Sequence, residues 1–141
     1  MTSVRLWFAR LVMLYAAAIF CFLGYLYLLR PLSGIAKFGV AVSGAPESIA
    51  FLRTSLGAMF ASMAITAIYG LVRPNYFRTC LIFLILMDGC IVTARLFGMV
   101  SEGVTPVQIG ELQTEGWSLL AFVVALWVCP RSIRAATGWP R

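Results

Sequence analysis

Long apolar segments separated by short polar ones constrain this sequence more than any other feature. They cover about residues 7–29, 47–72, 76–100 and 106–129, and each has the roughly 20 residues that a helix needs to cross a bilayer. Of the 141 residues, 62% are hydrophobic and 11% are charged, against roughly 25% charged in a soluble domain. The sequence predicts an all-α membrane protein, with a single domain over 1–141 folded as a four-helix transmembrane bundle.

Prolines and capping residues mark the ends of these segments. Arg30-Pro31 ends the first one, because proline disfavours a helical conformation in the residue before it. Residues 30–46 are then expected to form a long loop on the outer side, and Arg73-Pro74 a short turn. Thr105, Pro106 and Gln108 follow the pattern of an N-cap, a first-turn proline and a capping-box glutamine. The fourth helix is therefore expected to begin at Pro106.

Basic residues are divided unequally between the two ends of the segments. Cytoplasmic loops of membrane proteins are enriched in arginine and lysine. One side of this chain holds seven of the eleven basic residues, namely Arg5, Arg10, Arg73, Arg78, Arg131, Arg134 and Arg141. The other side holds four of the five acidic residues, namely Glu47, Glu102, Glu111 and Glu115. Both termini are therefore expected in the cytoplasm.

Several classes of site lack the residues that they need. The chain has no histidine, which removes the commonest general base and the commonest metal ligand. The net charge of +6 comes from residues that flank the apolar segments, without a basic patch for nucleic acid. We predict no metal, no cofactor, no nucleic acid and no catalytic residue. The four cysteines are expected to be reduced and buried: Cys21, Cys80, Cys90 and Cys129.

Charged residues inside the apolar segments are the candidate site. Asp88 lies near the middle of the third segment, where a charge costs roughly 2.5–3.5 kcal/mol on insertion scales and needs a partner or a proton. Arg95 follows two turns later on nearly the same face, about 10.5 Å closer to the outer surface. Glu111 and Glu115 share a face of the fourth segment near its outer end, where they are natural partners for an arginine.

A further arginine, Arg53, lies one to two turns inside the second segment. Gly57, Ala61 and Ala64 follow it along the same side, and small residues let membrane helices approach closely. This spacing points Arg53 into the bundle. The sequence therefore predicts an outer-side charge cluster in which the glutamates neutralise both arginines and the aspartate lies below. Its members are Arg53, Asp88, Arg95, Glu111 and Glu115.

Two interpretations of this cluster follow. It is either an interhelical clamp, meaning a set of ion pairs that fixes which helices pack, or a binding or proton-linked site. We predict a non-enzymatic integral membrane protein that binds a small amphiphile or lipid, or acts as an accessory subunit of a membrane protein partner. One alternative is a membrane enzyme on a lipid or sterol-like substrate, with Asp88 or Glu115 moving a proton. Another is an oligomeric transporter.

Four weak motifs lie along the chain: Arg53 with Gly57, Arg73-Pro74, Arg95 with Gly98, and Glu111 or Glu115. On these motifs most of the chain resembles the domain-of-unknown-function 4345 family of small four-helix bacterial membrane proteins. The resemblance implies a multi-pass protein of the bacterial cytoplasmic (inner) membrane and importance for Arg53 and Arg95. Members often have a tyrosine and paired glycines where this chain has Leu56 and Gly57. The resemblance implies no activity and does not extend to Asp88.

Overall fold

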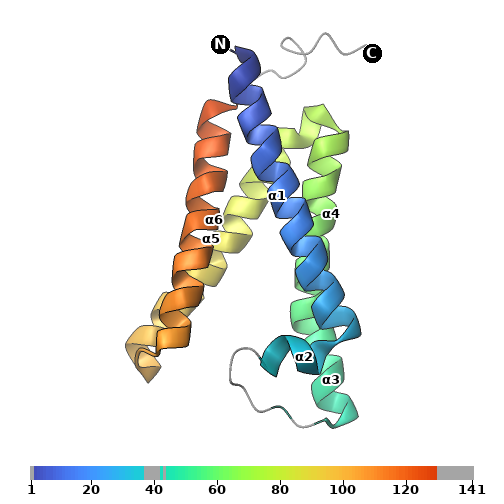
Figure 1. The fold of residues 1–141 in the computed structure, drawn as a ribbon, viewed down its shortest axis with the longest axis vertical. Helices are drawn as coiled ribbons and strands as arrows, with labels where there is room; N and C mark the ends of the chain where they lie inside the picture. Colours follow the sequence, from blue (N-terminus) through green and yellow to red (C-terminus); the bar gives the residue numbers. More distant parts are fainter. Residues whose placement is uncertain (1, 37–41, 43, 130–141) are drawn as a thin grey trace. The chain divides into compact units, whose positions relative to one another are not determined.

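The computed structural model describes residues 2–36, 42 and 44–129, and every element in this part of the chain is helical (Figure 1). This confirms the predicted all-α class. In chain order the elements are α1 (Thr2–Leu29), α2 (Pro31–Ala36), α3 (Pro46–Leu52), the π-helical turn η1 (Arg53–Gly57), α4 (Ala58–Val72), the 3₁₀ turn η2 (Pro74–Tyr76), α5 (Phe77–Glu102) and α6 (Pro106–Val128).

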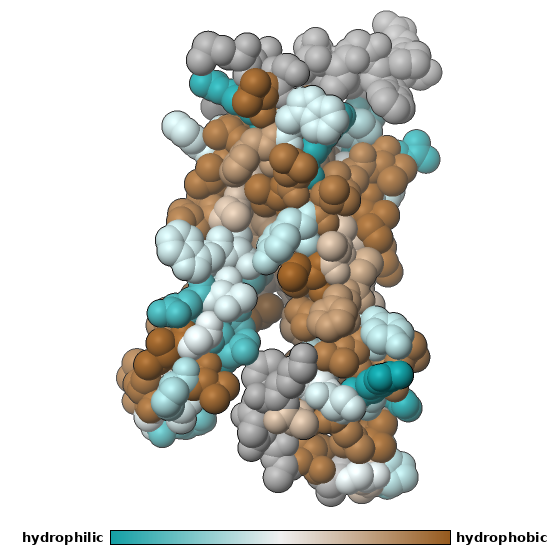
Figure 2. All heavy atoms as spheres, viewed as in Figure 1, coloured by the Kyte–Doolittle hydropathy of each residue, from teal (hydrophilic) through white to brown (hydrophobic). Residues whose placement is uncertain are grey.

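The helices carry apolar side chains on their exposed surfaces. Three stretches of the described residues are long and apolar enough to cross a membrane: Val4–Leu29, Pro46–Val72 and Pro74–Glu102. Hydrophobic residues cover much of the helical surface in view in Figure 2. The exposed large hydrophobic side chains include Phe51, Phe97 and Trp127. A soluble monomer rarely exposes so much contiguous apolar surface. The chain therefore has the surface of a membrane protein.

The fold consists of two compact units. The described residues of unit 1 are 2–13 and 69–129, and those of unit 2 are 14–36, 42 and 44–68. Unit 1 contains the beginning of α1, the last turn of α4, and both α5 and α6. Unit 2 contains the rest of α1, the short helices α2 and α3, η1 and most of α4.

In unit 1, α5 and α6 lie side by side (Figure 1). Their fully buried side chains include Leu81 and Leu84 on α5 and Phe122 on α6. At one end of the pair, the Arg78 guanidinium donates hydrogen bonds to the carbonyls of Leu126 (3.1 Å) and Cys129 (2.7 Å). These carbonyls belong to the last turn of α6, where backbone acceptors lack partners within the helix. Arg78 therefore joins the start of α5 to the end of α6.

In unit 2, glycines bring α1 close to the helix formed by α3, η1 and α4. A Cβ atom on Gly24 would lie 3.2 Å from the backbone nitrogen of Ala61, and one on Gly57 would lie 2.8 Å from Cδ2 of Leu28. Beside them, the ring of Phe60 lies 5.5 Å from that of Tyr27. The prediction that Gly57 and Ala61 form a close helix contact is confirmed, with α1 as the neighbouring helix.

The predicted element boundaries hold with three corrections. α1 begins at Thr2 instead of residue 7, and residues 30–46 were wrongly expected to be loop throughout. They contain α2, which Pro31 begins because a first-turn proline has no N–H to leave unpaired. The 3₁₀ turn η2 begins at Pro74, and the third helix begins after it at Phe77 instead of residue 76. The residues from 130 to the C-terminus, with three of the predicted cytoplasmic arginines, lie outside the described part.

Two local predictions about side chains have different outcomes. The capping box of α6 is confirmed: Thr105 Oγ1 accepts from the Gln108 backbone N–H (3.2 Å) and Gln108 Oε1 accepts from that of Thr105 (2.8 Å). None of the four cysteines, which all lie in the described part of the chain, forms a disulfide, as predicted, but only Cys80 and Cys129 are buried. The prediction of burial was wrong for the other two, because a small weakly polar thiol is also compatible with a lipid-facing position.

Candidate functional site

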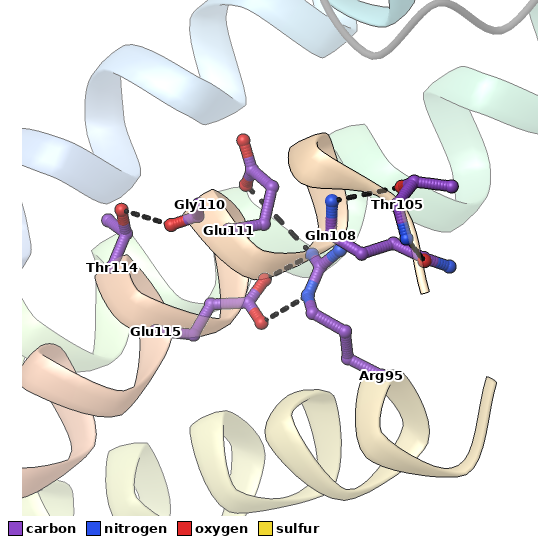
Figure 3. A network of polar contacts seen from close by, with 7 residues as sticks. All are labelled: Arg95, Thr105, Gln108, Gly110, Glu111, Thr114 and Glu115. Atoms are coloured by element: carbon purple, nitrogen blue, oxygen red, sulfur yellow. Dashed lines mark hydrogen bonds and ion pairs between the residues drawn. The ribbon is translucent and has the colours of Figure 1, made fainter. Parts of the chain in front are cut away.

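An ion pair between α5 and α6 is the centre of the candidate site in unit 1. Arg95 on α5 donates from Nε to Oε2 of Glu115 (2.6 Å) and from Nη2 to Oε1 (2.5 Å). The two side chains point toward each other across the helix pair (Figure 3). They are largely enclosed, with 24% of the Arg95 side chain and 16% of the Glu115 side chain exposed. Such a two-point arginine–carboxylate contact fixes both distance and orientation.

A second glutamate stands one helical turn nearer to the start of α6. Oε2 of Glu111 lies 3.9 Å from Nη2 of Arg95, and both glutamates approach the arginine from the same side (Figure 3). The capping box at Thr105 fixes where α6 begins, and the turn of the helix then brings residues four apart onto one face. The predicted pairing of Arg95 with Glu111 and Glu115 is therefore confirmed.

Asp88 precedes Arg95 on α5 and is 4% exposed. Its Oδ2 atom has no hydrogen-bond partner among the residues that the structure describes. The seven residues between Asp88 and Arg95 correspond to about 10.5 Å along the helix. Within the part of the chain that the structure describes, this buried carboxyl therefore has no ion pair with an arginine or lysine.

Arg53 lies in unit 2, in the π-helical turn. Its Nε atom donates a 3.0 Å hydrogen bond to the backbone carbonyl of Leu28 near the end of α1, and its side chain is otherwise exposed. The contact satisfies an acceptor that the end of a helix leaves open. The predicted neutralisation of Arg53 by Glu111 or Glu115 would join residues of two different units, and it stays a prediction.

The buried Asp88 carboxyl predicts a gain in stability when it is removed. We expect Asp88→Leu, which is similar in size and needs no hydrogen bonds, to raise the free energy of unfolding of the ligand-free protein by about 1–3 kcal/mol. Unfolding of the purified protein in mixed detergent micelles measures this. Leu84→Ala, a truncation of a fully buried side chain on the same helix, should be destabilising in the same assay. A loss of stability in Asp88→Leu would mean that the carboxyl already has a partner.

The chemistry open to this site is limited by how its groups are used. Two of the donor atoms of Arg95 are engaged by Glu115, so the arginine mainly holds the helices together. Within the described ranges, no group of three or more His, Cys, Asp or Glu side chains could hold a metal ion. Of the cluster's residues in the described part of the chain, Asp88 is the buried one, and its Oδ2 atom has no hydrogen-bond partner there, so this carboxyl can bind a donor or a proton.

Unit 2 contains a groove that the sequence analysis did not find. Its volume is about 640 Å³, and it lies between α2 and the helix that begins with α3. Its lining residues are Ile35, Val42, Glu47, Ser48, Phe51, Leu52, Ser55 and Leu56. One wall comes from the segment that was expected to be loop. The apolar residues around Ile35 and the acidic residue at the start of the second segment were the available signals.

The comparisons with known proteins found no match. No protein-family model, no curated protein and no solved structure matches this chain. The resemblance to the domain-of-unknown-function 4345 family therefore stays a prediction.

Proposed function

We propose that this chain is a non-enzymatic, multi-pass membrane protein that binds a small amphiphile or lipid at the charge cluster of α5 and α6. The observation that supports this most is the unpaired, buried Oδ2 atom of Asp88. Buried polar atoms of native proteins nearly always have a partner, and an ionisable residue inside a membrane is a functional candidate by default. A polar headgroup that donates a hydrogen bond would supply the missing partner.

In this proposal the residues of the cluster have separate roles. The Arg95–Glu115 pair holds α5 against α6, and Glu111 adds negative charge beside it. Asp88 receives the ligand's donor. A membrane protein partner could supply the same donor from one of its own helices, so an accessory subunit remains the second candidate function.

Native mass spectrometry of protein released from a mild neutral detergent tests the proposal. Wild type is compared with Asp88→Asn and Arg95→Ala for small molecules and proteins that copurify. Glu102→Gln, which removes an acid at the exposed end of α5, is the control. We expect a small molecule that wild type and the control retain and that Asp88→Asn loses. A protein retained in the same pattern would favour the accessory subunit, and a bare monomer in every sample would contradict both.

We also propose that α6 is a fourth span and that both termini lie in the cytoplasm of a bacterial cell, in its inner membrane. α6 is 23 residues long, which is enough to cross a bilayer, although its first half is polar. Pairing of Glu115 with Arg95 lowers the cost of placing that half in hydrocarbon. The distribution of arginines in the sequence gives the orientation.

Cysteine labelling from outside the cell tests this topology. In a chain whose native cysteines are replaced by alanine, single cysteines are placed by Arg73→Cys, Val104→Cys and Arg131→Cys. A membrane-impermeant maleimide should label position 104 in intact cells, and positions 73 and 131 only after the membrane is permeabilised. Labelling of position 131 in intact cells would contradict a fourth span.

A further inference from the structure

We propose that the groove of unit 2 binds a lipid of the surrounding bilayer that carries an ammonium headgroup, with an acyl chain in the groove and the ammonium at Glu47. None of the groove's lining residues belongs to the charge cluster of α5 and α6, and all of them lie in unit 2. The inference goes beyond the proposed function and holds even if that cluster is only a clamp.

The shape and the lining of the groove suit a hydrocarbon chain. Its volume of about 640 Å³ falls within the range of roughly 300–1,000 Å³ typical of small-molecule sites. Carbon atoms make up most of the lining, with side chains of Phe51, Leu52 and Leu56 on one wall and of Ile35 and Val42 on the other. Sites for small molecules have this composition, in which a few polar groups fix the orientation of the ligand.

The π-helical turn η1 shapes the first wall. A turn with i→i+5 hydrogen bonds holds one residue more than an α-helical turn, so the residues after Arg53 are rotated back about the helix axis. Ser55 and Leu56 both line the groove as a result. Hydroxyl groups support the altered backbone, because Thr54 Oγ1 donates to the Ala50 carbonyl (2.9 Å) and Ser55 Oγ to the Phe51 carbonyl (2.6 Å). Ser55 is thus engaged and leaves the groove wall apolar in character.

Charge at the groove identifies the headgroup. Among the described residues that line the groove, Glu47 is the one acidic residue and none is basic. Within the part of the chain that the structure describes, its carboxylate has no hydrogen bond or ion pair to another side chain, and it is exposed. An ammonium group would give it a charge-assisted hydrogen bond. A phosphate or carboxylate headgroup without a cation would instead be repelled.

The position of the groove identifies the source of the ligand. Glu47 lies in the first turn of the apolar stretch Pro46–Val72, so the groove begins where a membrane span meets the headgroup region. Phe51, on the same wall, is 67% exposed. An acyl chain can therefore enter sideways from the bilayer while its headgroup stays at the level of Glu47.

Lipid binding to the full chain in a neutral detergent, followed by native mass spectrometry, tests this inference. The probes are dioleoyl phosphatidylethanolamine, which has an ammonium group, and dioleoyl phosphatidylglycerol, which has the same chains and no cation. We expect the first to bind at least about tenfold more tightly. Glu47→Gln should remove this preference and Leu56→Trp, which fills the groove, should weaken binding of the first lipid. Glu102→Gln is the matched control and should change nothing.

Two results would overturn the inference: equal binding of the two lipids to wild type, or an unchanged preference in Glu47→Gln. Circular dichroism of both groove variants checks that their helices are intact. The two proposals can fail independently. If Asp88→Asn lost a copurifying ligand while Glu47→Gln kept the lipid preference, the proposed function would be supported and the groove would not be the lipid site.

Discussion

Replacing Arg95 with leucine should lower the free energy of unfolding by about 3 kcal/mol, the lower end of the range for breaking a buried ion pair. The substitution leaves Glu115 enclosed and charged, with 16% of its side chain exposed, and removes both hydrogen bonds from Arg95 on α5 to Glu115 on α6. Most of the expected loss of stability comes from the carboxylate of Glu115, which stays enclosed without a compensating cation. Unfolding in mixed micelles with increasing SDS, followed by circular dichroism, measures the loss.

The double variant Arg95→Leu/Glu115→Leu is the matched control for this prediction. It removes both charges together, so stability should return to within about 1 kcal/mol of wild type, since an apolar pair often replaces a buried ion pair at little cost. Arg95→Lys should be intermediate, because an ammonium group cannot make the two-point contact. If the single and double variants were equally unstable, the uncompensated carboxylate of Glu115 would not be the cause of the loss.

These variants also separate the two interpretations of the charge cluster. If the cluster is only a clamp, replacing Arg95 and Glu115 together should leave a protein that behaves like wild type in every respect. A binding site requires Asp88, which lies about two turns away on α5 and is not part of the clamp. Suppose that Arg95→Leu/Glu115→Leu restores stability and that Asp88→Asn loses the ligand. The same helix pair would then have both roles, each in different residues.

Features set by neighbours in the sequence could be predicted for this chain. Thr105, Pro106 and Gln108 define the start of α6 because a capping box involves only local atoms. The pairing of Arg95 with Glu115 could also be predicted, although these residues are distant in the sequence, because charges in an apolar segment need partners and few were available. The facing positions then followed from helix periodicity.

Features that depend on backbone conformation or on backbone acceptors could not be predicted. The π-helical turn at Arg53–Gly57 has no sequence signature of its own, although the hydroxyls that support it are visible as Thr54 and Ser55. The prediction for Arg53 considered charged partners alone, whereas the structure pairs it with a backbone carbonyl of Leu28. Every residue offers such a carbonyl, so a sequence does not identify the one that is used. The groove was missed because α2, one of its walls, was expected to be loop.

Gly24→Leu should destabilise unit 2 by about 3 kcal/mol, the upper end of the usual range for overpacking. A Cβ atom at this position would already lie 3.2 Å from the backbone nitrogen of Ala61 and 3.4 Å from its Cα. Backbone atoms cannot move aside as the end of a flexible side chain can, so α1 would have to separate from α4. The contact between Phe60 and Tyr27, whose ring centroids lie 5.5 Å apart, should be lost with it.

Gly110→Leu is the control for this prediction, because a Cβ atom there meets nothing within 4 Å. It replaces a glycine inside a helix, which should raise helix stability by up to about 1 kcal/mol. SDS unfolding compares the two variants, and Gly24→Ala provides a smaller version of the same collision. If Gly24→Leu were as stable as Gly110→Leu, α1 and α4 would not be packed through this glycine, and the close approach that positions Leu28 beside Gly57 and its carbonyl beside Arg53 would have to be abandoned.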